Sequence, residues 1–227
     1  MMNIEYFFTD TSDGNIAYHV NDKKDNVDIN RKNLAKKYNF DFENLYSINQ
    51  VHGNNIQIVD ENSHKLIEDC DGLITNSKNL TLMVMVADCI PIVFMDKTKG
   101  VIAAVHAGRN STFQKIASIT AKKMINEFLC KPCDVEVIMG PSIQKCCYEV
   151  NEELRNIVEN SFGKEFIKGN NIDLQGINKM LLNDIGILDI SISNICTKCS
   201  NKPYFSYRED NKCGRFAGLV TIKREVM

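Results

Sequence analysis

The sequence predicts an α+β fold, a mixed α/β architecture in which strands come in clusters and helices flank them. Two observations predict it: apolar runs of strand length follow one another closely between residues 47 and 105, and most amphipathic stretches of helical length come after them. Strands and helices that do not alternate regularly are typical of α+β proteins, whereas doubly wound sheets alternate. No fixed-period repeat or low-complexity tract appears, and four prolines leave no obvious linker. We therefore expect residues 1–227 to form a single domain.

The first half of the chain is predicted to contain one early strand, one helix and then a series of strands. Ile4–Phe8 is a short β-rich run, and residues 28–38 fit a helix in which Asn30 is the cap and Leu34 and Tyr38 lie one turn apart. Runs rich in Val and Ile follow, each too short for a helix, and they predict strands at 47–51, 56–59, 73–75, 82–86, 90–95 and 101–105.

The second half is predicted to contain most of the helices. Ser111 or Thr112 can cap a helix whose apolar positions 113, 117, 120, 124 and 128 share one face. A strand at 135–139 ends at a Gly-Pro pair. Helices are expected at 151–159, where acidic residues suit the N-terminal end of the dipole, and at 173–185, which stops at Gly186. Strands at 190–192, 204–207 and 216–222 complete the prediction.

Composition excludes several classes of protein. Hydrophobic residues make up 44% and charged residues 25% of the chain, which is ordinary for a globular protein. The 27 basic and 29 acidic side chains give a net charge of −2, so we expect no nucleic-acid partner. Asp88 and Cys89 interrupt the longest apolar run, and no signal peptide is visible. We therefore expect a soluble, cytoplasmic protein with no membrane partner, whose nine cysteines are reduced thiols, some of them bound to metal.

Three predicted strand ends carry residues that could bind a metal ion. His52 and His106 each follow a strand and precede a glycine within two residues, and Cys89 stands at the end of a third strand. Two imidazoles and a thiolate are a good ligand set for Zn²⁺, and three protein ligands leave the fourth position open for water or substrate. An open site of this kind lowers the pKa of bound water or polarises an oxygen atom.

Sequence spacing leaves other interpretations of these residues open. A histidine near a strand end can be a hydrogen-bonded structural residue, and a cysteine among apolar neighbours can simply be buried. Cys89 could also pair with one histidine as a nucleophile and its base, without any metal. Asp88 could orient a ligand from behind, or it could cap a turn.

The remaining cysteines suggest a competing metal site. Cys130 and Cys133 form one C-x-x-C pair and Cys196 and Cys199 form another, as a four-thiolate zinc site would need. Their separation is far larger than in ordinary zinc ribbons, which argues against such a site. The adjacent Cys146 and Cys147 are expected to point apart.

Taken in order, several segments resemble one protein family. Those in the first half are Gln50-Val51-His52-Gly53, Asp71-Gly72-Leu73-Ile74-Thr75, Ala87-Asp88-Cys89-Ile90-Pro91 and Val105-His106-Ala107-Gly108; those in the second half are Gly140-Pro141-Ser142-Ile143, Cys147-Tyr148-Glu149-Val150, Phe205-Ser206-Tyr207-Arg208 and Gly214-Arg215. Together they resemble the laccase-domain, or polyphenol oxidase, family, whose members are regarded as purine nucleoside phosphorylases. The resemblance runs from about Asn15 to Ile222.

The resemblance implies a fold, a metal and a reaction. The fold would be a single layered sandwich domain, and one Zn²⁺ would be held by His52, Cys89 and His106. The reaction would be phosphorolysis of adenosine, inosine, guanosine and methylthioadenosine to the free base and pentose 1-phosphate, so the partners would be purine nucleosides and phosphate. Deamination of adenosine is attributed to the same site.

Two alternatives to this function stay open. The older description of the family is copper-dependent oxidation of phenols, but four histidines are few for holding several copper ions. The chain could also be a metal-binding module whose catalysis has decayed.

Further roles follow from the proposed chemistry. Arg208 is the first candidate to neutralise phosphate charge, and Glu149 is the candidate carboxyl group for proton transfer. After His-Ala-Gly the family usually has Trp, then Arg or Lys, then Gly; this chain has Arg109, Asn110 and Ser111 instead, so Arg109 is a candidate to supply the positive charge there. Residues 9–14 also lack the arginine that the family usually has near its N-terminus. Both differences bear on substrate and rate more than on the metal.

Overall fold

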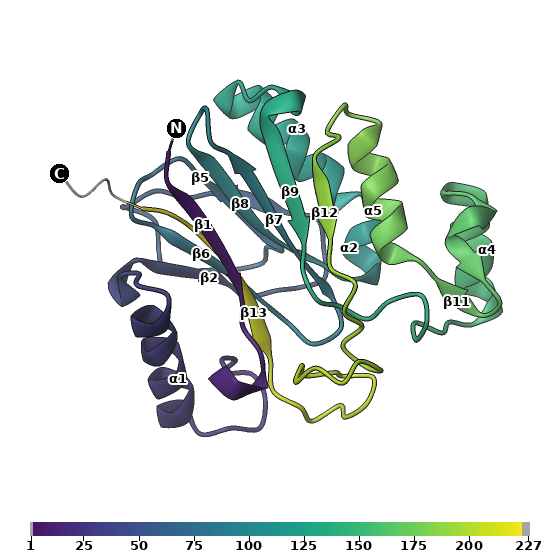
Figure 1. Cartoon of the computed structure of the whole chain (residues 1–227), viewed down its shortest axis with the longest axis horizontal. Coiled ribbons are helices and arrows are strands. Elements are labelled where there is room, and N and C mark those ends of the chain that lie inside the picture. The colour runs from purple at the N-terminus through teal and green to yellow at the C-terminus, as the bar shows by residue number, and fades with distance from the viewer. Residues whose placement is uncertain (1, 224–227) are drawn as a thin grey trace.

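Two mixed β-sheets lie face to face at the centre of the molecule, and helices cover their outer faces (Figure 1). The computed structural model describes residues 2–223. The order of strands in the five-stranded sheet is β1 (Ile4–Phe8), β13 (Phe216–Ile222), β6 (Thr81–Val86), β2 (Leu45–Ile48) and β4 (Leu66–Ile67). The order in the six-stranded sheet is β12 (Ile190–Ile192), β9 (Val135–Met139), β7 (Ile90–Asp96), β8 (Val101–Ala107), β5 (Gly72–Thr75) and β3 (Ile56–Ile58).

The main core lies between the two sheets. Val84 and Val220 of the five-stranded sheet belong to the same buried cluster as Val93 and Ile102 of the six-stranded sheet. Every residue of β6, β7, β8 and β13 is buried, because these central strands have a packed layer on both faces. This explains why their sequences are continuous apolar runs and do not alternate with polar residues.

Helices complete a four-layered sandwich. On the six-stranded sheet, α2 (Arg109–Phe113), α3 (Ile116–Phe128) and α5 (Leu174–Asn183) form one layer. On the five-stranded sheet, α1 (Lys24–Lys37) buries Leu34 against Met83 and Leu219. The remaining helix, α4 (Glu152–Ser161), lies farther out beside the small hairpin of β10 (Ile167–Lys168) and β11 (Asn171–Ile172). The predicted α+β layered sandwich is therefore confirmed.

No helix within residues 2–223 is both long enough and apolar enough to cross a membrane.

Most predicted elements are present, but two helix starts are wrong. Helix α1 begins at Lys24, and Asn30 lies inside it, where its side-chain amide donates to the carbonyl oxygen of Asn15 at 2.8 Å. The helix expected after residue 111 is in fact two, α2 and α3, divided at Lys115, whose φ of 62° is left-handed. Ser111 and Thr112 are therefore buried within α2 and cap nothing.

The aromatic segment 204–207 is a loop and not the predicted strand. Its aromatic residues favour a strand on propensity alone. In the structure, Tyr204 packs edge-on against Phe216 with ring centroids 5.0 Å apart, and no strand within residues 2–223 pairs with the segment. The short strands β4, β10 and β11 were not predicted, because two residues are too few to form a recognisable pattern.

Candidate metal centre

His52, Cys89 and His106 come together at one end of the sandwich. Their ligand atoms all lie within 4.8 Å of one another, and the imidazole rings of His52 and His106 meet edge-on with centroids 4.7 Å apart. His106 is in β8, and Cys89 immediately precedes β7. Because β7 and β8 are antiparallel neighbours and Pro91 lies opposite His106, the sheet register brings Cys89 close to His106. His52 arrives from the loop after β2 of the other sheet. The centre therefore joins the ends of both sheets.

Two residues at the centre have left-handed backbones. The φ angles of His52 and Asp88 are 58° and 83°, values that side chains other than glycine rarely adopt. Such conformations persist where surrounding contacts hold them, and they cluster at functional sites. At His52 the contacts are backbone hydrogen bonds: the N–H groups of Val51, His52 and Gly53 all donate to the carboxylate of Asp71.

Asp71 holds two of the three candidate ligand residues, His52 and His106, at once. Its buried carboxylate accepts from Gly53 N at 2.6 Å and from His52 N at 3.0 Å, and Oδ1 lies 2.8 Å from Nδ1 of His106. Burial alone would raise the pKa of Asp71, but the hydrogen bonds from His106 and from these N–H groups outweigh it, so the pKa lies below its ordinary value. The carboxylate occupies Nδ1 of His106 and leaves Nε2 as the nitrogen for a ligand bond.

The charges of Cys89 and His106 support each other. Burial would raise the pKa of the Cys89 thiol, but His106 and His52 beside it outweigh that effect and lower it. Burial would likewise lower the pKa of His106, but Cys89 and Asp71 raise it. These neighbours favour the thiolate of Cys89, which is the form that binds metals. Two imidazoles and one thiolate fit a divalent ion such as zinc with one open position.

Gly108 leaves the room that the three ligands need. A Cβ atom at this position would lie 3.0 Å from Sγ of Cys89 and 3.2 Å from Cδ2 of His52. Gly108 also caps the N-terminus of α2 directly after β8. A side chain here would press on two ligands together.

A cavity of about 560 Å³ adjoins the three ligands. Its other polar lining residues include His19, Gln50, Tyr207 and Arg215. The Gln50 side chain is fixed by two 2.8 Å hydrogen bonds to the backbone of Met85. The volume lies in the range of small-molecule sites.

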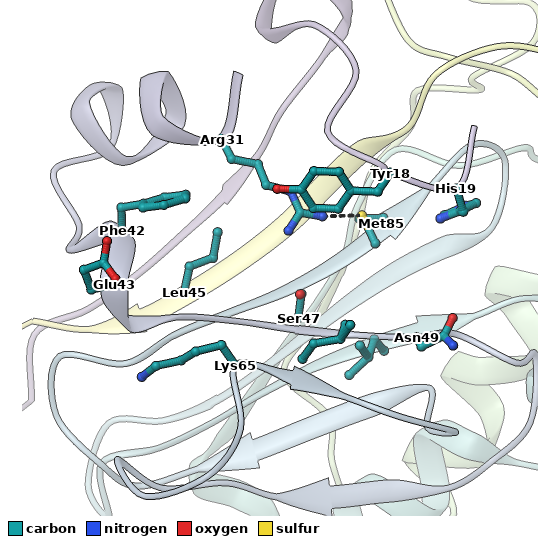
Figure 2. A pocket seen from close by; sticks show the side chains of 12 residues that line it. Tyr18, His19, Arg31, Phe42, Glu43, Leu45, Ser47, Asn49, Lys65 and Met85 are labelled. Atoms are coloured by element: carbon teal, nitrogen blue, oxygen red, sulfur yellow. Dashed lines mark hydrogen bonds between the residues drawn. The ribbon is translucent and has the colours of Figure 1, made fainter. Parts of the chain in front are cut away.

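A second cavity of about 450 Å³ continues the first. The two share His19, Ile48, Asn49 and Met85. Figure 2 shows this second cavity, with His19 and Asn49 at one end and Phe42 and Glu43 at the other. Its lining is mostly apolar and includes Phe42, Leu45 and Leu66, while the buried Arg31 lies 4.3 Å from the ring centroid of Tyr18. A polar space beside the ligands thus leads into an apolar one.

Three other predicted side chains do not line the cavity beside the ligands. Glu149 and Arg208 line a separate open pocket, where Nη1 of Arg208 donates to the backbone oxygen of Glu149 at 3.0 Å. Arg109, the first residue of α2, donates from Nε to the side chain of Asn110. The structure brings the predicted metal ligands together and leaves Glu149, Arg208 and Arg109 outside the cavity lining.

Sequence reasoning missed three residues of the centre: Asp71, His19 and Arg215. Asp71 and Arg215 belong to quoted motifs, but only sheet pairing and loop packing show what they face. Nη1 of Arg215 donates to the backbone oxygens of Cys213 and Gly214, at 2.8 and 3.0 Å, which holds the side chain at the cavity. Partial burial and the nearby Arg215 lower the pKa of His19, which favours the neutral imidazole.

Asp88 does not orient a metal ligand directly. Its carboxylate accepts from Oγ1 of Thr197 at 2.6 Å and from the backbone N–H of Arg208 at 2.7 Å. Asp88, which directly precedes Cys89, is therefore hydrogen-bonded to the distant loop that contains Thr197 and Arg208.

The two C-x-x-C motifs do not form one ligand group, in agreement with their large separation in sequence. Cys130 is buried after α3, and Cys133 is exposed in the following turn. Within the described residues, Cys196 and Cys199 instead form a ligand group with Cys146 and Cys147. The prediction that Cys146 and Cys147 point apart is wrong, because their sulfur atoms converge.

Comparisons with known proteins identify the family of this chain. The family model described as multi-copper polyphenol oxidoreductase laccase matches residues 8–223. The chain is 29% identical to purine nucleoside phosphorylase YlmD of Bacillus subtilis, over 92% of this chain and 82% of that protein. It is 33% identical to a purine nucleoside phosphorylase of Clostridium acetobutylicum, over 94% and 90%. The crystal structure of the hypothetical protein YfiH of Bacillus licheniformis superposes with a TM-score of 0.91 at 27% identity, covering 97% of this chain and 93% of that one.

Proposed function

The chain belongs to the multi-copper polyphenol oxidoreductase laccase family, whose family model matches residues 8–223. We propose that it is a zinc-dependent purine nucleoside phosphorylase. Its substrates would be adenosine, inosine, guanosine and methylthioadenosine, with phosphate as the second substrate. Adenosine deamination would be a further activity of the same centre, and the enzyme would act in the cytoplasm. The observation that supports the proposal most is the meeting of His52, Cys89 and His106 at the wall of a two-part cavity.

The three ligands suit one zinc ion better than several copper ions. His52, Cys89 and His106 would hold zinc, which supplies a Lewis acid for substrate oxygens and an acidic bound water. Copper-dependent oxidation of phenols by a multicopper centre needs many more imidazoles. Of the four histidines, only His52 and His106 join a ligand group in the described part of the chain.

The two-part cavity suits the two ends of a nucleoside. We place the pentose and phosphate beside the metal ligands, where Gln50 can hydrogen-bond to hydroxyl groups and Arg215 can neutralise phosphate charge. The purine would lie in the apolar cavity, near Leu45 and Leu66. Phosphate would then approach C1′ as the base leaves, and the base would depart along the continuous cavity.

The remaining candidates would act from the rim. The guanidinium carbon of Arg208 lies 5.2 Å from the ring centroid of Tyr148. The pKa of the Tyr148 phenol is raised, mainly by burial, and the charges of Arg109, Cys89 and Arg208 also act on it. Tyr148 is therefore close enough to feel both arginines and the Cys89 sulfur. Arg208 and Arg109 stay candidates for guiding phosphate, and Glu149 stays the candidate proton carrier in deamination.

Phosphate-dependent release of hypoxanthine from inosine tests the function. The zinc-loaded protein is compared with Cys89→Ala, which removes a ligand, and with Cys133→Ser, a matched change of an exposed thiol outside the centre. We expect release that needs phosphate, vanishes in Cys89→Ala and persists in Cys133→Ser. A folded, zinc-bound wild-type protein that releases no hypoxanthine would contradict the proposal, and ammonia release from adenosine would then be tested as the remaining activity of the centre.

A further inference from the structure

Four thiols from two distant loops converge outside the metal centre. Cys146 and Cys147 lie in the turn between β9 and α4, and Cys196 and Cys199 lie in the turn after β12. Their sulfur atoms are all within 4.8 Å of one another, and those of Cys146 and Cys199 are 3.5 Å apart although 53 residues separate them in sequence. All four are free thiols.

The spacing of the sulfur atoms suits tetrahedral coordination. A zinc–sulfur bond of about 2.3 Å in a tetrahedron places the sulfurs about 3.8 Å from one another. The 3.5 Å pair lies close to that spacing, and the 4.8 Å limit leaves a contraction of about 1 Å at most. A disulfide would need the sulfurs to approach to about 2.05 Å. The arrangement is therefore nearer to a shared ion than to a covalent bond.

The cluster lies where polar contacts already bring the two loops together. An isolated β-bridge joins Ser142 to Cys196, and Nε2 of Gln144 donates to the carbonyl oxygen of Ser193 at 2.6 Å. The same loops reach the metal centre through Asp88, whose backbone oxygen accepts from Ile143 N and whose carboxylate accepts from Thr197 and Arg208. A link between the loops would therefore stabilise the support of Asp88, the neighbour of Cys89.

We propose that Cys146, Cys147, Cys196 and Cys199 bind a second, structural Zn²⁺ ion that fastens the 140–150 loop to the 193–208 loop. Four thiolates close the coordination sphere, so this ion has no open position for substrate. It is independent of the ion at His52, Cys89 and His106, and its role is to hold the loops that carry Tyr148 and Arg208.

Zinc content per chain tests this site apart from the first. The full chain is reduced, loaded with zinc, freed of excess metal and analysed for zinc, together with a Cys196→Ser/Cys199→Ser variant and a His52→Ala/His106→Ala variant. We expect about two zinc ions in the wild type and about one in each variant. A Cys130→Ser/Cys133→Ser variant, which alters the other C-x-x-C pair, should keep both ions. Cys146→Ser, a single change at an exposed position, gives the same test if the double variant does not fold.

X-ray absorption identifies the ligands of the retained ion. In His52→Ala/His106→Ala, the proposal predicts four sulfur neighbours at about 2.3 Å and no nitrogen near 2.0 Å. Nitrogen or oxygen neighbours, or zinc content that does not change in Cys196→Ser/Cys199→Ser, would overturn it. A Cys146–Cys199 disulfide in the wild type isolated under reducing conditions would do the same. If the wild type holds one zinc ion, and that ion is lost in Cys196→Ser/Cys199→Ser but kept in His52→Ala/His106→Ala, the result would support the cysteine site and contradict zinc at His52, Cys89 and His106.

Discussion

The two ligand groups of this protein are built in opposite ways. His52, Cys89 and His106 are held by strand ends, by the buried carboxylate of Asp71 and by the space at Gly108, and they face a cavity. The cysteine cluster is built from two turns, and two of its four members are exposed. Three rigid donors leave a position for substrate, whereas four donors on loops fill the coordination sphere. The comparison indicates what separates a reactive centre from a structural one. The number of donor atoms, and the elements that hold them in place, matter more than whether a donor is cysteine.

Among changes that leave both ligand groups intact, we expect Arg215→Gln to have the largest effect on activity. The change removes the positive charge beside the open centre and touches no predicted metal ligand. We expect kcat/KM for phosphate to fall by about 100-fold, because charge that develops during the reaction loses its partner. Steady-state kinetics with inosine and varied phosphate measure this. Arg215→Lys should retain part of the activity, and an unchanged kcat/KM in Arg215→Gln would show that phosphate binds elsewhere, with Arg208 as the next candidate.

Asp71→Asn should weaken only the open centre. The amide keeps the size of the carboxylate but loses its charge and offers one acceptor oxygen to several donors. Loss of such a partner behind a ligating histidine typically weakens metal affinity by about 10- to 100-fold. Competition with a zinc chelator should reveal one weakened site and one unaltered site. Equal affinity in both proteins would mean that Asp71 does not support His106 in binding metal.

Gly108→Ala should have a smaller effect on the same centre. The added Cβ presses on Cys89 and His52 at 3.0 and 3.2 Å, and overpacking of this kind costs about 1–3 kcal/mol. We expect zinc affinity at the open centre to fall by about tenfold, with zinc at the cysteines unchanged. The chelator competition measures both sites in one titration. Wild-type affinity at both would indicate that the ligands relax freely around the methyl group.

Cys199→Ser should lower stability with little direct effect on the open centre. A bound structural ion stabilises the folded state, and each kcal/mol lost shifts the melting temperature of a chain of this size by about 2–4 °C. We expect a fall of about 5 °C for the zinc-loaded variant in a thermal melt. Cys133→Ser is the control, as an exposed cysteine outside the cluster. Equal melting temperatures for Cys199→Ser and wild type would remove the stabilising role.

The sequence predicts the open centre better than the closed one for a physical reason. His52, Cys89 and His106 each lie at or just beyond the end of a predicted strand, and apolar runs make strand ends visible. The resemblance to a family then nominates the same residues. Asp71 was missed because its role depends on the pairing of β5 with β8, which brings its carboxylate to His106.

The cysteine cluster could not be assembled from spacing. Two C-x-x-C motifs suggest each other, but Cys130 lies at the end of a helix on the outer layer, and the true partners Cys146 and Cys147 form no such motif. The paths of the loops decide which cysteines meet, and these paths cannot be derived from spacing. They also place Glu149 and Arg208 at a separate pocket. The break at Lys115 escaped prediction for a similar reason, because one left-handed residue leaves no mark on an amphipathic pattern.

Inosine phosphorolysis by two variants, each of which keeps only one of the two proposed zinc ions, tests most directly which site is catalytic. Cys196→Ser/Cys199→Ser carries zinc only at the open centre, and His52→Ala/His106→Ala carries it only at the cysteines. Hypoxanthine release is measured with and without phosphate, at a temperature where both variants are folded. We predict phosphate-dependent release by the first variant and none by the second. Release by the second variant, or none by a folded and zinc-bound first variant, would contradict the assignment of catalysis to His52, Cys89 and His106.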